Sequence, residues 1–120
     1  MPQKIKEKSF DFALNSLKTF KKLQSNKEYI ISKQFLRSST SIGALIRESE
    51  FAESKKDFIH KLAIALKEAN ETIYWLDLLK CADYLEKCQY TELKSQNKQI
   101  IYMLIAIIKS SKKNMAKASN

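Results

Sequence analysis

The sequence predicts an all-α protein that folds as one domain containing four long helices. Apolar residues recur at helical spacing in four segments. The 120 residues contain one glycine and one proline, and the proline is Pro2, so the turn signals that sheet proteins need are missing. Only short polar stretches separate the segments, which favours an antiparallel up-down-up-down four-helix bundle. A chain of this length can bury one core, so residues 1–120 form a single expected domain.

The first two helices are expected at about residues 4–24 and 29–52, joined by the polar stretch QSNKE. When successive residues are placed about 100° apart round the helix axis, the apolar residues of each segment gather on one side. In the first segment this side holds Ile5, Phe10, Phe12, Ala13, Leu17, Phe20 and Leu23. In the second segment it holds Ile31, Phe35, Ile42, Leu45 and Ile46.

The last two helices are expected at about residues 54–80 and 88–113, with the pattern broken by CADYLEK and a frayed tail at 114–120. Ser54 can cap the third helix, and Asp57 can return the bond three residues later. The core side of the third helix holds Leu62, Ala65, Ala69, Thr72 and Leu76. That of the fourth holds Leu93, Ile100, Leu104, Ile107 and Ile108.

The stretch FLRSSTSIGALIRES places four hydroxyl residues beside the only glycine, Gly43. Consecutive hydroxyls on a helix point about 100° apart and cannot converge on one substrate atom, so no catalytic residue is expected here. Glycine inside a helix costs about 1 kcal/mol relative to alanine, and close approach of another helix would offset that cost. The sequence therefore predicts close helix packing at Ser39 and Gly43.

Charged residues near this stretch are expected to fix the register of neighbouring helices. Inter-helix salt bridges are predicted among Arg37, Arg47, Glu48, Glu68 and Glu71. Acid–base catalysis by the same carboxylates would need a pocket and shifted pKa values, so the protein is not expected to be an enzyme. One histidine and two cysteines, Cys81 and Cys88, cannot build a zinc site or a disulfide framework, so no metal or cofactor is expected.

Two further features bear on location. The two cysteines fit a reduced, cytoplasmic protein. The longest apolar run, IIYMLIAII, has nine residues, against the roughly 20 that a membrane-spanning helix needs, so no membrane association is expected.

The formal net charge of +9 comes from the two ends of the chain. Residues 1–28 carry seven lysines against three carboxylates, residues 29–88 are balanced at nine each, and residues 89–120 carry six lysines against one carboxylate. In an up-down-up-down bundle the first and last helices are neighbours, so their lysines are expected to form one basic face. This candidate nucleic-acid-binding set consists of Lys4, Lys8, Lys18, Lys22, Lys94, Lys98, Lys109 and Lys112. Such a face suits polyanions, while the alternative is a lysine-rich surface that is only solvated.

The third helix carries a second apolar patch opposite its core side. The patch is expected to contain Ile64, Tyr74, Trp75 and Leu78. Exposed apolar patches with aromatic residues usually mark interfaces, so these residues are predicted to form an oligomer interface.

LRSSTSIGALIRES, followed by AESKKDFIHKLAIALKEANETIYWLDLL, resembles the signature of the bacterial 23S rRNA intervening-sequence proteins, and the resemblance covers about residues 5–110. It implies a left-handed antiparallel four-helix bundle that assembles into a ring-shaped homopentamer. A distantly similar protein, the accessory protein of diversity-generating retroelements, uses a basic pentameric barrel to engage a reverse transcriptase and nucleic acid. Many relatives have ANIAEG where this chain has GALIRES, so roles of that segment transfer only to Arg47 and Glu48.

Two functional hypotheses follow. The first is a non-enzymatic oligomeric bundle that binds RNA or DNA, or associates with a reverse transcriptase as an adaptor, through its lysine-rich face. The alternative is a protein-interaction scaffold with no nucleic-acid role, whose basic face only keeps it in solution.

Overall fold

The computed structural model describes residues 2–119, which form four helices joined by short connections. The helices are α1 (Gln3–Ser25), α2 (Ile31–Ser49), α3 (Lys55–Cys81) and α4 (Lys87–Ser119). No strand occurs within these residues, so the predicted all-α fold with four helices is confirmed. The tail differs from the prediction, because α4 continues through 114–119 where fraying was expected. Residue 120 lies outside the described residues.

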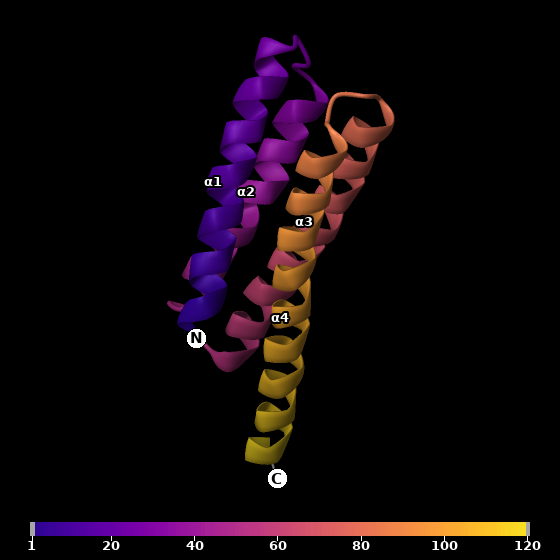
Figure 1. Cartoon of the computed structure of the whole chain (residues 1–120). Helices are drawn as coiled ribbons and strands as arrows, with labels where there is room; N and C mark the ends of the chain where they lie inside the picture. The colour runs from indigo at the N-terminus through magenta and orange to yellow at the C-terminus, as the bar shows by residue number, and fades with distance from the viewer. Residues whose placement is uncertain (1, 120) are drawn as a thin grey trace.

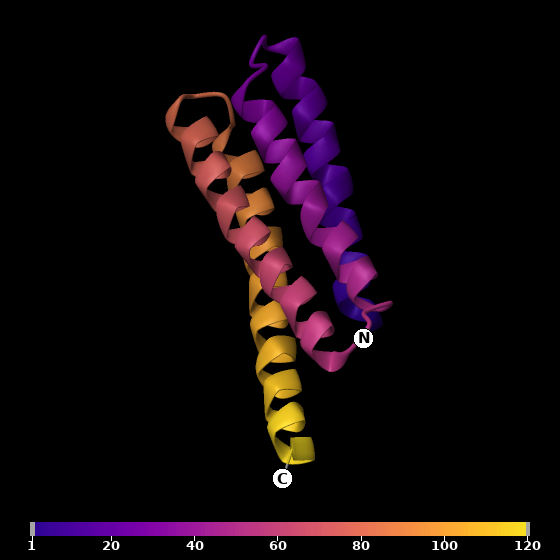
Figure 2. The same cartoon turned by 180° about the vertical axis from the view of Figure 1, so that it is seen from behind.

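Each helix runs back along the one before it (Figures 1 and 2). The α1–α2 and α3–α4 connections lie at one end of the molecule, and the α2–α3 turn and the N-terminus lie towards the other. Both α1 and α3 pack against α2 and α4, so α1 and α3 form one diagonal of the bundle. The last turns of α4 project beyond the other three helices, and the molecule measures 56 × 22 × 21 Å.

The core combines large apolar side chains with small polar ones. Its largest fully buried residues include Phe12, Phe35, Leu76 and Ile100. Small polar residues also have buried positions on all four helices: Ser9, Ser16, Thr19, Ser32, Ser38, Ser39, Ser49, Thr72 and Asn97. Small side chains bring helix backbones close together, so the bundle is narrow.

Two residues of α1 contradict the predicted core. Phe10 is 56% exposed and Leu17 is 40% exposed, although both were expected to point inward. The buried side of α1 instead follows Ile5, Phe12 and Leu23, with Ser9, Ser16 and Thr19 between them. The broad apolar side of α1 is therefore wider than the arc that α2 and α4 cover.

Side-chain caps fix the starts of α2 and α3. The buried Glu28 carboxylate accepts hydrogen bonds from the backbone N–H groups of Ile31 and Ser32, a cap that the sequence analysis missed. At α3, the Asp57 N–H donates to Ser54 Oγ over 3.0 Å, as predicted. The Asp57 carboxylate, however, accepts from the N–H of Glu53 at 3.1 Å rather than from that of Ser54.

Candidate nucleic-acid and subunit interfaces

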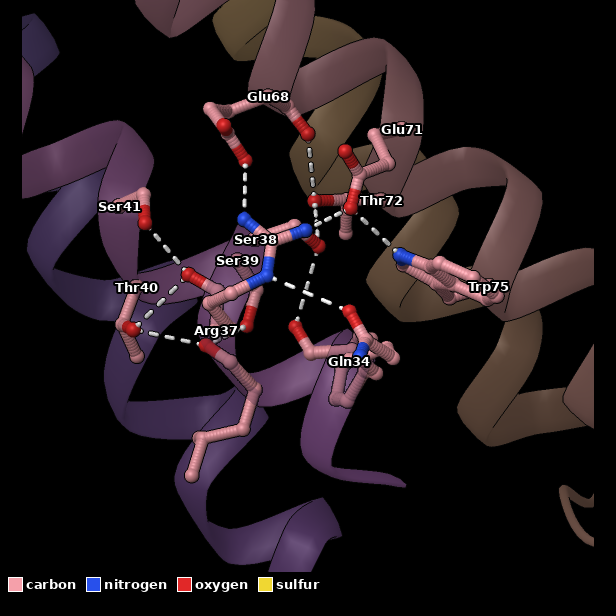
Figure 3. A network of polar contacts seen from close by, with 12 residues as sticks. Gln34, Arg37, Ser38, Ser39, Thr40, Ser41, Glu68, Glu71, Thr72 and Trp75 are labelled. Atoms are coloured by element: carbon pink, nitrogen blue, oxygen red, sulfur yellow. Dashed lines mark hydrogen bonds and ion pairs between the residues drawn. The ribbon is translucent and has the colours of Figure 1, made fainter. Parts of the chain in front are cut away.

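The hydroxyl run of α2 bonds mainly to its own helix (Figure 3). Ser39 Oγ and Thr40 Oγ1 donate to the Leu36 carbonyl, and Ser41 Oγ donates to the Arg37 carbonyl. Ser38 Oγ lies in the core, 2.8 Å from Thr72 Oγ1 of α3. Because each hydroxyl has a structural partner and they point in different directions, the run does not form a catalytic cluster.

The close packing predicted at Gly43 involves α1. A Cβ atom built at Gly43 would lie 3.4 Å from Ser9 Oγ and 3.5 Å from the Ser9 carbonyl oxygen. Ser39, one turn earlier on α2, is fully buried. The α1 backbone therefore approaches Gly43 closely, but a methyl group at this position would make only ordinary van der Waals contacts.

Arg37 connects α2 to α3 (Figure 3). Its guanidinium forms ion pairs with Glu68, at 3.1 Å, and with Glu71. Glu71 also accepts a hydrogen bond from Trp75 Nε1 at 2.9 Å. This part of the predicted salt-bridge set is brought together as expected.

The other part of that set is not formed. Within residues 2–119, neither Arg47 nor Glu48 takes part in an ion pair. The Arg47 guanidinium instead lies 5.8 Å from the centroid of the Phe10 ring, so its partner is an exposed aromatic ring on α1. Glu48 is exposed to solvent.

The candidate lysines of α1 lie mostly in solvent. Lys4, Lys18 and Lys22 are exposed, while the Lys8 ammonium donates to Gln99 Oε1 of α4 at 2.9 Å. Asn15 also reaches α4, by donating to Gln96 Oε1 at 2.7 Å. The side of α4 that meets α1 therefore presents glutamines rather than lysines.

Two of the four candidate lysines of α4 lie beside α3. Lys94 donates to Asp77 of α3 at 3.1 Å and to the Tyr90 hydroxyl at 2.7 Å. Lys98 is exposed but close enough to contribute to a lowered pKa of Asp77. Lys112 lines a groove with Lys56 and other residues from the start of α3. Lys94 and Lys112 of the predicted set therefore lie beside α3, while Lys98 and Lys109 are exposed, and the single basic face across α1 and α4 stays a prediction.

Asp77, Tyr90 and Lys94 form a polar link between α3 and α4. The hydrogen bond from the Tyr90 hydroxyl, 2.6 Å long, is the main cause that lowers the pKa of Asp77, and Lys94 adds to this effect. Tyr90 and then Asp77 raise the pKa of Lys94. Lys94 is thus held by protein groups, which makes it a poorer phosphate contact than the exposed lysines.

The predicted oligomer interface is partly exposed. Tyr74 and Leu78 are 58% and 37% exposed, whereas Ile64 and Trp75 are half-buried. Trp75 packs against the core and meets the Tyr74 ring edge-on at 5.1 Å. The outward part of the predicted patch is therefore centred on Tyr74 and Leu78.

A second apolar surface lies on α1 and was missed. Phe10, Leu14 and Leu17 are all at least 40% exposed and lie on one side of the helix. The sequence signal was the width of the apolar side of α1, which exceeded what one buried face needs.

No group of three or more His, Cys, Asp or Glu side chains within residues 2–119 could hold a metal ion. None of the described helices is long and apolar enough to span a membrane.

Comparisons with known proteins identify the family. The model of the 23S rRNA-intervening sequence protein family matches residues 2–106. A crystal structure from Bacteroides thetaiotaomicron, described as a protein with unknown function from the S23 ribosomal protein family, is 51% identical to this chain. The match covers 88% of this chain and 98% of that one, with a TM-score of 0.86. None of the curated proteins matches the chain. The chain belongs to the 23S rRNA-intervening sequence protein family.

Proposed function

We propose that the protein is a non-enzymatic, oligomeric bundle that binds the backbone of RNA or DNA through exposed lysines and acts as an adaptor for a protein partner. One observation carries this proposal. Only Lys6, Arg37, Lys61 and Lys94, of 22 basic residues, form ion pairs within residues 2–119. Most of the positive charge is therefore available to a polyanion.

Lysine chemistry defines the kind of recognition to expect. An ammonium group acts as a point charge and contacts phosphates rather than base edges, so binding should be largely independent of sequence. The family name refers to the intervening sequences of 23S rRNA, which makes RNA the first polyanion to test. A reverse transcriptase is the protein partner that the distant resemblance suggests. The two free, exposed cysteines are compatible with a cytoplasmic location.

The arrangement of exposed apolar residues supports assembly into a ring. Tyr74 and Leu78 lie on α3, and Phe10, Leu14 and Leu17 lie on α1, the helix diagonal to it. Two different patches on one subunit suit head-to-tail contacts, which form a ring where the rotation between successive subunits closes. Five subunits are the number that the family resemblance implies. The same patches also favour the second candidate function, a protein-interaction scaffold, because they do not require nucleic acid.

Fluorescence anisotropy distinguishes the two functions. Labelled single-stranded and duplex RNA and DNA, each in two unrelated sequences, are titrated with the protein over a range of salt concentrations. We expect similar affinity for unrelated sequences and a steep loss of affinity with salt, each neutralised phosphate adding about 0.7–0.9 to the slope of log K against log salt. No binding at low salt would reject the nucleic-acid function and leave the scaffold.

A further inference from the structure

We infer that the C-terminal part of α4, residues 109–117, together with the first turn of α3, is the site that binds the phosphate backbone. We call residues 109–117 the α4 arm. This inference rests on the proposed function and gives its binding site a location. It differs from the basic face predicted from the sequence, which joined α4 to α1.

The α4 arm has a dense and uncompensated positive charge. Its basic residues are all exposed: Lys109, Lys112, Lys113 and Lys117. No carboxylate side chain follows Glu92 in the sequence, so α4 supplies no internal partner for these lysines. Within residues 2–119, none of the four takes part in an ion pair.

The start of α3 adds two more exposed lysines beside the arm. Lys56 and Lys112 line the same groove of about 590 Å³, together with His60, and Lys55 lies in the adjoining cleft with Ser111 and Asn114 of α4. Six lysines from two segments therefore lie at one end of the molecule.

The carboxylates at this end compensate little of that charge. Asp57 lines the groove, and its carboxylate lies 3.9 Å from the Lys61 ammonium and accepts a hydrogen bond from the backbone N–H of Glu53. Glu50, in the cleft, is paired with Lys6 at 3.2 Å. The Glu48 and Glu53 side chains form no ion pair within the described residues, so two unpaired carboxylates near the α2–α3 turn stand against six lysines.

The shape of the arm suits a long polyanion. The first part of the arm lies beside the first turn of α3, and the last turns of α4 project past the other helices, so a nucleic-acid strand can approach from this open end of the molecule (Figures 1 and 2). Its lysines span an arc of about 140°, opposite the half-buried Ser111 and Met115, which face α3. Lys109, Lys113 and Lys117 are spaced about 6 Å apart along the helix axis, and every second phosphate of one DNA duplex strand is offset by roughly 6.8 Å along the duplex axis.

The lysine stripe of α1 is a weaker candidate. Glu7 and Asp11 are exposed. When residues are placed about 100° apart round the helix axis, these two carboxylates lie in the same sector as Lys4, Lys18 and Lys22. These carboxylates repel phosphate and reduce the local positive potential. The α4 arm has no such interruption.

Two matched triple variants locate the site. Lys109→Glu, Lys113→Glu and Lys117→Glu are combined in one variant, and Lys4→Glu, Lys18→Glu and Lys22→Glu in the other. All six positions are exposed, and both variants lower the net charge equally. Circular dichroism and sedimentation check that each full-length variant keeps the helix content and size of the wild type.

We expect the arm variant to lose more than about tenfold in affinity for labelled RNA at low salt, and its salt slope to fall by about 2–3. The α1 variant should retain most of the affinity and slope, and a triple Lys→Arg variant of the arm should bind like the wild type. If the α1 variant loses as much as the arm variant, or more, the location is wrong although the proposed function stands. A wild-type protein that does not bind overturns both.

Discussion

At the scale of single residues, the notable feature is the number of small polar side chains in the core. Most of them donate to a carbonyl one turn earlier in their own helix, as Ser49 Oγ does to the Ile46 carbonyl. Two buried side-chain atoms within the described residues, Ser16 Oγ and Asn97 Oδ1, have no hydrogen-bond partner. A buried polar group without a partner costs about 1–3 kcal/mol, so these positions limit stability.

Replacing Ser16 with alanine should stabilise the protein. The change removes the hydroxyl that has no partner and introduces a better helix former, so the free energy of unfolding should rise by about 1 kcal/mol. Ser38→Ala is the matched control, because it removes a buried hydroxyl that is bonded to Thr72 and should destabilise. Urea unfolding followed by circular dichroism measures both, and a destabilised Ser16→Ala would show that the hydroxyl has a role.

Gly43→Ala should be tolerated and should stabilise by up to about 1 kcal/mol. The new methyl would meet Ser9 at ordinary contact distances, and alanine costs less backbone entropy in a helix. Gly43→Leu should destabilise, because the larger side chain would push α1 away from α2. Urea unfolding followed by circular dichroism measures the stability of both variants. A strong loss of stability for Gly43→Ala would mean that α1 and α2 cannot move apart to accommodate a methyl group.

At the scale of elements, polar contacts fix the ends and the registers of the helices. Glu28 begins α2, Ser54 begins α3, and Arg37 joins these two helices through Glu68 and Glu71. Asp77, Tyr90 and Lys94 then join α3 to α4. The pKa values of Asp77 and Lys94 are shifted, so the contribution of this last contact to stability should depend on pH.

Asp77→Asn should lower stability by at most about 1 kcal/mol at neutral pH, because the group is half exposed. The folded pKa of Asp77 lies below its ordinary 3.8, so the stabilisation is complete above that value and is lost as the pH falls through the folded pKa. The folded pKa of Lys94 lies above its ordinary 10.5. The contribution of Lys94 to stability is therefore complete below 10.5 and is lost as the pH rises through the folded pKa.

The stability difference between wild type and Asp77→Asn should therefore be constant between these two limits and shrink outside them. Chemical unfolding over a pH series measures this difference. The same difference at strongly acidic and at neutral pH would contradict the assigned role of the Asp77 carboxylate.

At the scale of the whole molecule, sequence periodicity was enough to predict four helices and most of their core residues. It could not predict how each helix is rotated about its own axis. In the observed rotation of α1, Ser9 packs against Gly43 while Phe10 and Leu17 lie in solvent. The rotation of α4 places Gln96 and Gln99 against α1 and Lys94 against α3. Both depend on tertiary contacts between residues distant in sequence, which a helical wheel does not contain.

Tyr74→Ala should weaken assembly and leave the fold of the subunit intact. Its ring is 58% exposed and contributes little to the core, so its removal should cost interface contacts rather than folding free energy. Tyr102→Ala is the matched control, since Tyr102 is a 66% exposed tyrosine on α4 outside both apolar patches. Sedimentation at a series of protein concentrations measures the assembly of both variants. If Tyr74→Ala and Tyr102→Ala assemble equally well, Tyr74 is not part of the subunit interface.

Sedimentation velocity tests most directly whether the protein is an oligomer that binds the phosphate backbone of RNA. The wild-type protein is used at micromolar concentration and is mixed with a fluorescent RNA oligonucleotide. We predict one protein species larger than a monomer, with five subunits expected. At low salt the oligonucleotide should sediment with it, and at high salt the two should separate because the contacts are with phosphates. A monomer, or an oligonucleotide that sediments at its own rate even at low salt, would contradict the account.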